Sequence, residues 1–319
     1  SQSDIQTVGF SLNPSLKIRN VFKGAETLEI SGIASIGASD DLKEEGDPFF
    51  DIIEFGVDVK LTIPRLFSPF YTENIIPKYM SPSTRIGLAT TSQKNIGLDK
   101  RTFSGNFSYN WLPNPQVTNR LDLFNVQYVR NLNPDNYFGV YNNSFSSLNK
   151  IAQDVGYIGS DSDLTIPDGA NTFIDYVLNE TTPSEISSSQ LETINGIDER
   201  QNRLTENNLI LSSSFNFTKD QRTNLFDHDF SIFRFKLELA GNLLAGTSKL
   251  LGLKKDNDGR YEFLNVAYSQ YVKTEFDYIK HWDLGKKNVL ATRAFFGIAI
   301  PYGNSKSIPF AKSFFGGGP

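Results

Sequence analysis

KNVLATRAFFGIAIPYGNSKSIPFAKSFFGGGP, residues 287 to 319, carries the most informative order of residues in the chain. It opens as a strand, is interrupted at Pro301–Asn304, and continues through an aromatic segment to Phe314, Phe315 and a run of glycines. Proline and glycine end strands and set up turns. Paired aromatic residues followed by glycines predict a segment that packs onto another part of the protein and then bends sharply. An ordinary loop after an ordinary strand has a similar composition, so the rest of the chain must decide between the two.

Alternating apolar and polar residues upstream of this stretch predict a sheet of antiparallel strands. The clearest run is 53–63, in which apolar residues at odd positions alternate with Glu54, Gly56, Asp58, Lys60 and Thr62. A period of two is typical of a strand with one apolar and one polar face. Similar runs recur along the chain, and they do not alternate regularly with helices as in βαβ units. We therefore expect about ten antiparallel strands joined as hairpins. The predicted strands include 84–91, 103–111, 209–217, 233–239, 261–278 and 288–300.

Composition excludes several classes of protein. The 31 basic and 36 acidic residues are nearly balanced, which does not indicate nucleic-acid binding. The chain has no cysteine and only two histidines, His228 and His281, so we expect no disulfide, no metal site and no cofactor. It also lacks the sequence motifs of nucleophilic and phosphate-binding sites, and we expect no enzyme activity.

The chain has no apolar run of the length that a membrane-spanning helix needs, whereas a membrane-spanning β-strand needs only about 9–11 alternating residues. Residues 131–207 show no strand pattern. They read as a long loop with short helices at 144–154 and 171–178. So long a loop is unusual in a compact soluble domain but natural at one rim of a membrane barrel.

Aromatic residues gather near predicted strand ends. Tyr109 and Trp111 end one strand, and the turn-rich connection 64–82 holds Phe67, Phe70, Tyr71 and Tyr79. Such residues form girdles at the two interfaces of a membrane barrel, although a soluble core would also use them.

The order of motifs in residues 287–319 resembles the BamA/TamA family of outer-membrane assembly barrels. Arg293, the Pro301–Asn304 turn, Ile308–Phe310, Phe314-Phe315 and Gly316–Gly318 stand where that family has a basic strand residue, a PYGN-like turn, an LPF-like segment, paired aromatics and glycines. The Asn20–Glu26 turn, Thr223–Phe226 and Leu237–Gly241 follow the family pattern in order and spacing. The Arg-Gly signature that follows in the family is not in this sequence, which ends at Pro319.

This resemblance implies a transmembrane antiparallel β-barrel in the bacterial outer membrane. Residues 1–319 would form a single barrel portion, about ten of about sixteen strands, of the Bacteroidota TamA-like type. The first strand, the last strands and the periplasmic POTRA domains would lie outside this piece. The implied work is the insertion of other outer-membrane proteins, with membrane lipids, lipopolysaccharide, client proteins and accessory assembly proteins as partners.

The resemblance also implies that residues 301–319 begin a loop that folds into the barrel lumen. The residues expected to form this loop are Pro301, Tyr302, Gly303, Asn304, Pro309, Phe310, Phe314, Phe315, Gly316 and Gly317. The strand alternation separately predicts a set of charges on the polar, lumen-facing side: Glu54, Asp58, Lys60, Arg234, Lys236, Glu238 and Arg293. These charges either dock the loop through ion pairs or simply line a wet interior.

Two other classes of protein share parts of this pattern. A porin or a two-partner secretion translocator would show the same alternation, with less reason for the order of motifs in 301–319. A soluble all-β carbohydrate-active domain would need a cleft with paired carboxylates.

Overall fold

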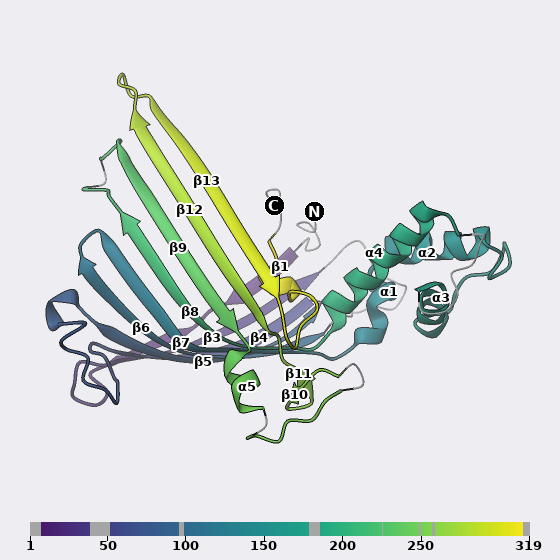
Figure 1. The fold of residues 1–319 in the computed structure, drawn as a ribbon, viewed down its shortest axis with the longest axis horizontal. Coiled ribbons are helices and arrows are strands. Elements are labelled where there is room, and N and C mark those ends of the chain that lie inside the picture. The colour runs from purple at the N-terminus through teal and green to yellow at the C-terminus, as the bar shows by residue number, and fades with distance from the viewer. Residues whose placement is uncertain are drawn as a thin grey trace.

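The computed structural model describes residues 8–38, 52–95, 99–178, 186–224, 226–248, 250–256 and 259–314. Its main element is a curved antiparallel sheet (Figure 1) in the order β1-β3-β4-β5-β6-β7-β8-β9-β12-β13, with β2 also paired to β3. The strands are β1 (Val8–Leu12), β2 (Ser15–Arg19), β3 (Thr27–Ala38), β4 (Ile52–Ile63), β5 (Ser83–Asn95), β6 (Lys100–Asn114), β7 (Val117–Asn131), β8 (Asn208–Asp220), β9 (Phe230–Ala240), β12 (Tyr271–Asp283) and β13 (Val289–Pro301).

The sheet confirms the predicted antiparallel architecture. Strands β1 and β2 are two halves of one edge strand, broken at Pro14, whose carbonyl accepts a hydrogen bond from the Gly32 amide at 2.9 Å. Proline is tolerated there because edge strands can spare an amide donor. The path therefore has ten strand positions, in agreement with the sequence, and β1 and β13 are its two edges.

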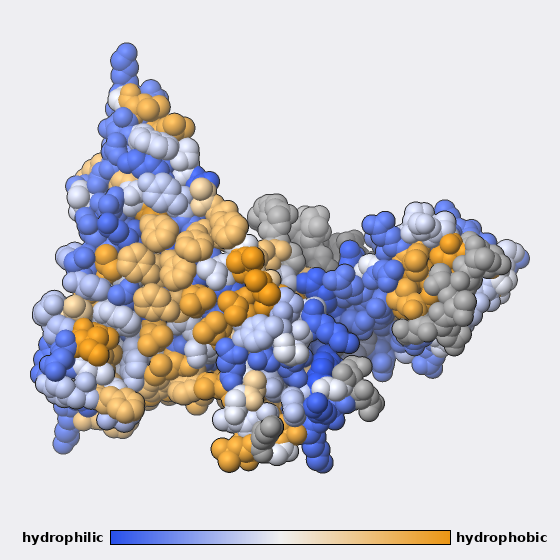
Figure 2. All heavy atoms as spheres, viewed as in Figure 1, coloured by the Kyte–Doolittle hydropathy of each residue, from blue (hydrophilic) through white to orange (hydrophobic). Residues whose placement is uncertain are grey.

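The two faces of the sheet differ in chemistry. Large hydrophobic side chains are exposed on one face, with Phe55 61% and Phe296 60% exposed, and we call this the apolar face. Figure 2 shows hydrophobic atoms spread over the part of the molecule formed by β9, β12 and β13. Alternate residues of the same strands carry the charges and amides, and we call their side the polar face. Since the strands carry the predicted period of two, the faces follow directly from the sequence.

The insert between β7 and β8 holds more helix than the predicted long loop with two short helices. It contains η2 (Pro134–Asn136), α1 (Tyr137–Val140), α2 (Asn142–Asp154), α3 (Asp168–Leu178) and α4 (Ser188–Thr205). These helices share a hydrophobic core in which Tyr137, Leu148, Phe173 and Ile194 are fully buried. Helices α2 and α3 agree with the two predicted segments. The start of α4 was missed, although Ser187 and Gln190 form a capping box there.

The connection between β9 and β12 also differs from the prediction. A strand was expected from residue 261, but the long strand begins at Tyr271. Before it lie α5 (Asn242–Thr247) and a separate small hairpin, β10 (Glu262–Phe263) and β11 (Val266–Ala267), shown below the sheet in Figure 1. Leu264 and Asn265, both at positive φ, form the tight turn of that hairpin. The alternation in 261–278 therefore spans two structures, the β10–β11 hairpin and the first part of β12. The predicted strand 84–91 is part of the longer β5.

Candidate functional site

The polar face carries a ladder of opposite charges across β9 and β12. Glu238 lies opposite Lys273, Lys236 opposite Glu275, and Arg234 opposite Asp277. Opposite charges on directly paired residues stabilise a sheet, and like charges would destabilise it. The register between these two strands is therefore supported by charge as well as by hydrogen bonds.

Asp277 of β12 binds side chains from both neighbouring strands, β9 and β13. Its carboxylate accepts a hydrogen bond from Arg234 Nη1 of β9 at 3.0 Å and from Arg293 Nε of β13 at 2.7 Å. A second contact joins Arg293 Nη2 to Asp277 Oδ2 at 3.2 Å. Such bidentate geometry favours arginine over lysine at position 293. Arg293 thus holds the edge strand β13 to its neighbour.

Glu238 is the most enclosed charge of this face, with a side chain that is 2% exposed. Its Oε1 accepts hydrogen bonds from Lys312 Nζ and from Tyr271 Oη, each at 2.8 Å. Lys236 Nζ lies 3.3 Å from Oε2. An enclosed carboxylate needs such partners because an unpaired one carries a large desolvation cost. Lys312 lies outside the sheet, in the segment that follows β13.

Residues 302–314, which we call the returning segment, fold back over the polar face after β13. The segment begins with a turn in which Gly303 has φ +59°, and an added Cβ would lie 2.3 Å from Gln270 Oε1. Glycine is therefore the residue that fits at this position. The Asn304 side chain donates hydrogen bonds to the carbonyls of Tyr261 at 2.8 Å and Tyr268 at 2.9 Å. This turn thus joins the returning segment to the β10–β11 hairpin.

The middle and end of the returning segment make apolar contacts with the polar face. Ile308 packs on a small buried cluster of Ile210, Ala240 and Tyr271. Phe314 lies so close to Gly297 that an added Cβ would be 2.5 Å from its ring. The Lys273 Nζ is 4.1 Å from the centre of the Phe314 ring, within the range of a cation–π contact. η3 (Phe310–Lys312) lies between these two contacts.

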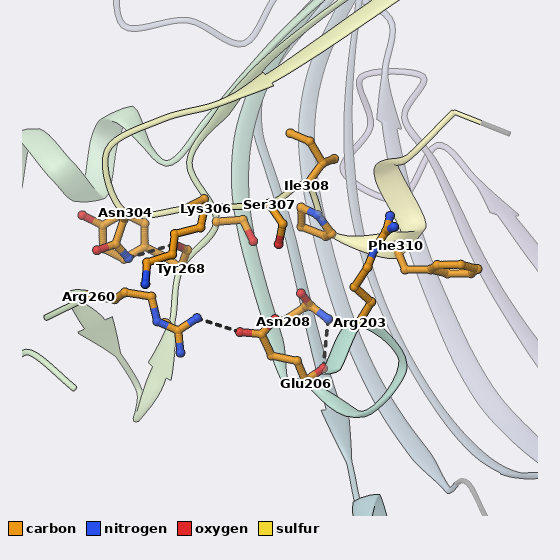
Figure 3. A pocket seen from close by; sticks show the side chains of 14 residues that line it. Arg203, Glu206, Asn208, Arg260, Tyr268, Asn304, Lys306, Ser307, Ile308 and Phe310 are labelled. Atoms are coloured by element: carbon orange, nitrogen blue, oxygen red, sulfur yellow. Dashed lines mark hydrogen bonds and ion pairs between the residues drawn. The ribbon is translucent and has the colours of Figure 1, made fainter. Parts of the chain in front are cut away.

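The helical insert reaches the same segment through α4. Arg203, in the last turn of α4, donates a hydrogen bond to Ser313 Oγ and lies 5.8 Å from the centre of the Phe310 ring. Figure 3 shows the small pocket formed where Asn304 to Phe310 face Arg203, Glu206 and Arg260. Arg260 Nη1 lies 2.9 Å from Glu206 Oε1 across this pocket.

A larger open cavity of about 440 Å³ lies on the polar face beside Lys312. Its lining is polar throughout: Asn110, Thr118, Arg120, Asp122, Asn125, Ser214, Asn216, Thr218, Lys236, Glu238 and Lys312. Asp122 is bound by Arg120 Nε at 2.7 Å and Ser214 Oγ at 2.8 Å, and Glu238 by the two lysines. Each of the two carboxylates in the cavity is thus engaged by a cation. Among the described residues, no group of three or more His, Cys, Asp and Glu side chains is placed to hold a metal ion.

The seven charges predicted from alternation all fall on the polar face, and one of them contacts the returning segment by an ion pair, Glu238 with Lys312. Asp58 and Lys60 form their own pair at 3.4 Å on β4, and Glu54 lies opposite Ser35 of β3. The predicted loop residues from Pro301 to Phe314 are described; Pro309 is buried and Phe310 is exposed. Phe315, Gly316 and Gly317 lie outside the described residues.

Sequence reasoning missed several residues that build this site. Lys273, Glu275 and Asp277 show a polar alternation within the predicted strand 261–278, but they were not assigned to the charged face. Lys312, Arg203 and Gln270 act through contacts between distant parts of the chain, such as Lys312 with Glu238, and carry no local signal.

The chain was compared with known proteins. No family model matches it. No curated protein matches it. Among solved structures, it is similar to the crystal structure of BamA from Haemophilus ducreyi lacking POTRA domains 1–3, with 9% sequence identity and a TM-score of 0.44. The match covers 97% of this chain and 44% of that chain, so this chain spans less than half the length of that BamA chain. In the part of the chain that is described, no helix is both long and apolar enough to cross a membrane.

Proposed function

We propose that this chain is part of a transmembrane β-barrel of the bacterial outer membrane that assists the insertion of other outer-membrane proteins, without catalysis. One observation carries the proposal. The sheet has an exposed apolar face and a charged polar face, and the segment after β13 folds back onto the polar face. In a barrel the apolar face meets lipid and the polar face lines a wet lumen.

The exposed apolar side chains support the lipid-facing assignment. Phe55, Val57, Phe296 and Ile298 point away from the returning segment and are between 45% and 61% exposed. A contiguous apolar surface of this kind needs a cover, either protein or lipid. The alternation runs through whole strands of 11 to 15 residues, long enough to span a bilayer at the tilt of a barrel strand.

The role in assembly rests on the returning segment. The sequence 301–314 resembles the lumenal loop of the BamA/TamA family, and it braces β9, β12 and β13 from the polar side. The proposed partners are lipids, lipopolysaccharide, unfolded client barrels and accessory assembly proteins. The Bacteroidota TamA-like type is the proposed subclass.

The test is an insertion assay with the full-length protein. We expect liposomes that contain it to fold an unfolded outer-membrane barrel protein faster than empty liposomes, measured by the shift in gel mobility of unheated samples. Lys312→Met, which removes the ion pair to Glu238, should reduce this acceleration. Lys150→Met, which changes an exposed lysine on α2 of the helical insert, serves as the matched control. Ion conductance without acceleration would instead identify a porin-like channel, and a protein that stays soluble without detergent would refute the barrel.

A further inference from the structure

The connection between β4 and β5, residues 64–82, exposes an unusual number of large apolar side chains. Five of them are between 59% and 78% exposed: Phe67, Phe70, Tyr71, Ile75 and Tyr79. In Figure 1 this connection is the dark blue loop at the lower left, where hydrophobic atoms also appear among hydrophilic ones in Figure 2. A cluster of this kind marks a contact surface.

Hydrogen bonds fix this connection onto the apolar face rather than the polar one. The Thr84 hydroxyl accepts a hydrogen bond from the Phe67 amide at 2.7 Å and donates one to the Arg65 carbonyl at 2.8 Å. Tyr109 Oη donates to the Phe67 carbonyl at 2.7 Å. Thr84 and Tyr109 are paired across β5 and β6, on the same side as Ile86 and Phe107. The helical turn η1 (Lys78–Met80) lies against β6. The exposed side chains are therefore continuous with the apolar face.

The rim that carries this connection also carries the short turns of the sheet. The turns between β6 and β7, β8 and β9, and β12 and β13 lie at the same strand ends, whereas the helical insert and the β10–β11 hairpin lie at the opposite ends. In outer-membrane barrels the short turns face the periplasm and the long loops face outward. The leaflet beside residues 64–82 is then the phospholipid leaflet on the periplasmic side.

We propose that residues 64–82 form an interfacial anchor that inserts Phe70, Ile75 and Tyr79 into the headgroup region of this phospholipid leaflet. The inference rests on the proposed function, because it requires lipid at the apolar face. Phenylalanine and tyrosine suit the membrane interface, where an apolar ring meets a wet boundary. Lys78 and Glu73, paired at 3.3 Å and both exposed, supply polar groups for the headgroups. A bilayer fits better than a protein partner because the cluster extends a surface that already faces lipid.

Residues 1–319 contain no cysteine, so a single cysteine introduced for a spin label is unique within this part of the protein. Phe70→Cys and Tyr79→Cys variants of the full-length protein are labelled with a nitroxide in vesicles of phosphatidylethanolamine and phosphatidylglycerol. Collision with oxygen, which concentrates in lipid, is compared with collision with a water-soluble nickel chelate. We expect the oxygen-to-nickel ratio at both sites to exceed, several-fold, the ratio at Gln116→Cys. Gln116 is exposed in the short β6–β7 turn at the same rim.

A fourth label separates the two possible failures. Phe55→Cys lies on the apolar face of β4, away from the anchor. A lipid-like ratio at residue 55 with a water-like ratio at residues 70 and 79 would overturn the anchor and leave the barrel standing. Labels at 70 and 79 that neither reagent reaches would show that protein covers them, which also overturns the anchor. A water-like ratio at residue 55 would refute the barrel itself.

Discussion

Exchanging the character of two neighbouring residues of β9 tests the assignment of the two faces. Phe235 lies on the apolar face, with its ring 5.1 Å from that of Phe276 across the strand pair. Lys236, the next residue, points to the polar face and pairs with Glu238 at 3.3 Å. Both lie at the middle of the strand, so depth in the bilayer is matched and only the direction of the side chain differs.

The two substitutions are expected to make the free energy of folding into the membrane less favourable by clearly different amounts. In Phe235→Lys, a lysine on the lipid face near the bilayer midplane costs about 2–4 kcal/mol. The lost apolar contact with Phe276 and its neighbours adds about 1–2 kcal/mol. Lys236→Phe removes one of the two lysines beside Glu238, and Lys312 and Tyr271 stay bound to that carboxylate, so the loss is about 1 kcal/mol. The difference of about 2–5 kcal/mol corresponds to a factor of about 30 to 5 × 10³ in the folding equilibrium.

The assay is folding into liposomes across a urea titration, read as the fraction of protein that keeps its folded gel mobility when it is not heated. We expect Phe235→Lys to shift the midpoint to much lower urea or to abolish insertion, and Lys236→Phe to stay near the parent protein. Equal tolerance of both substitutions would refute the facing assignment. A larger effect of Lys236→Phe would mean that the faces are reversed.

Three further predictions concern local contacts. Lys312→Met should release the returning segment, because it leaves the Glu238 carboxylate without its closest cation. Trypsin should then cut faster after Lys306, which is exposed. Gly303→Ala should cost about 1–3 kcal/mol, because alanine at φ +59° is strained and its Cβ meets Gln270, and the temperature at which folded mobility is lost should fall. Hydrogen bonds from the backbone amides of Glu26 itself and of Gly24 hold the pKa of the Glu26 carboxyl below its ordinary value. The turn that precedes β3 is therefore stabilised at neutral pH and loosens as the pH falls below about 4.5. A lower protection of the Gly24 amide, measured against its intrinsic exchange rate at each pH, should show this, and Glu26→Gln should remove the pH dependence.

Strand alternation predicted the faces of the sheet wherever the pairing is regular. Residues 120–130 show no single period of two, and the structure gives the reason. A register shift lies between Asp122 and Asn125 of β7, so odd positions face the apolar side before it and even positions after it. A shift of one residue moves every later side chain to the other face. A strand that contains a bulge therefore does not show one period of two along its whole length.

The helical insert and the contacts of the returning segment could not be predicted from local sequence patterns, for a different reason. The helices of 137–205 are stabilised by a shared core whose members are scattered among polar residues, and packing rather than propensity sets most helix stability. The pair Glu238–Lys312 joins residues 74 positions apart and depends on the path of the returning segment. The turn at Gly303 and the strand charge at Arg293 were visible in the sequence, but their partners Gln270 and Asp277 were not assigned.

The contacts of the returning segment bear directly on the edge strand β13. Phe314 packs on Gly297 of β13, Lys312 binds Glu238 of β9, and the Lys312 carbonyl accepts a hydrogen bond from Lys273 of β12 at 2.9 Å. One short segment thus spans the last strands of the sheet from the polar side. An isolated edge strand would be held by one neighbour alone, and its end would fray. In the proposed barrel, the segment therefore holds β13 in register with β12 through side-chain contacts that add to the backbone hydrogen bonds of the strand pair.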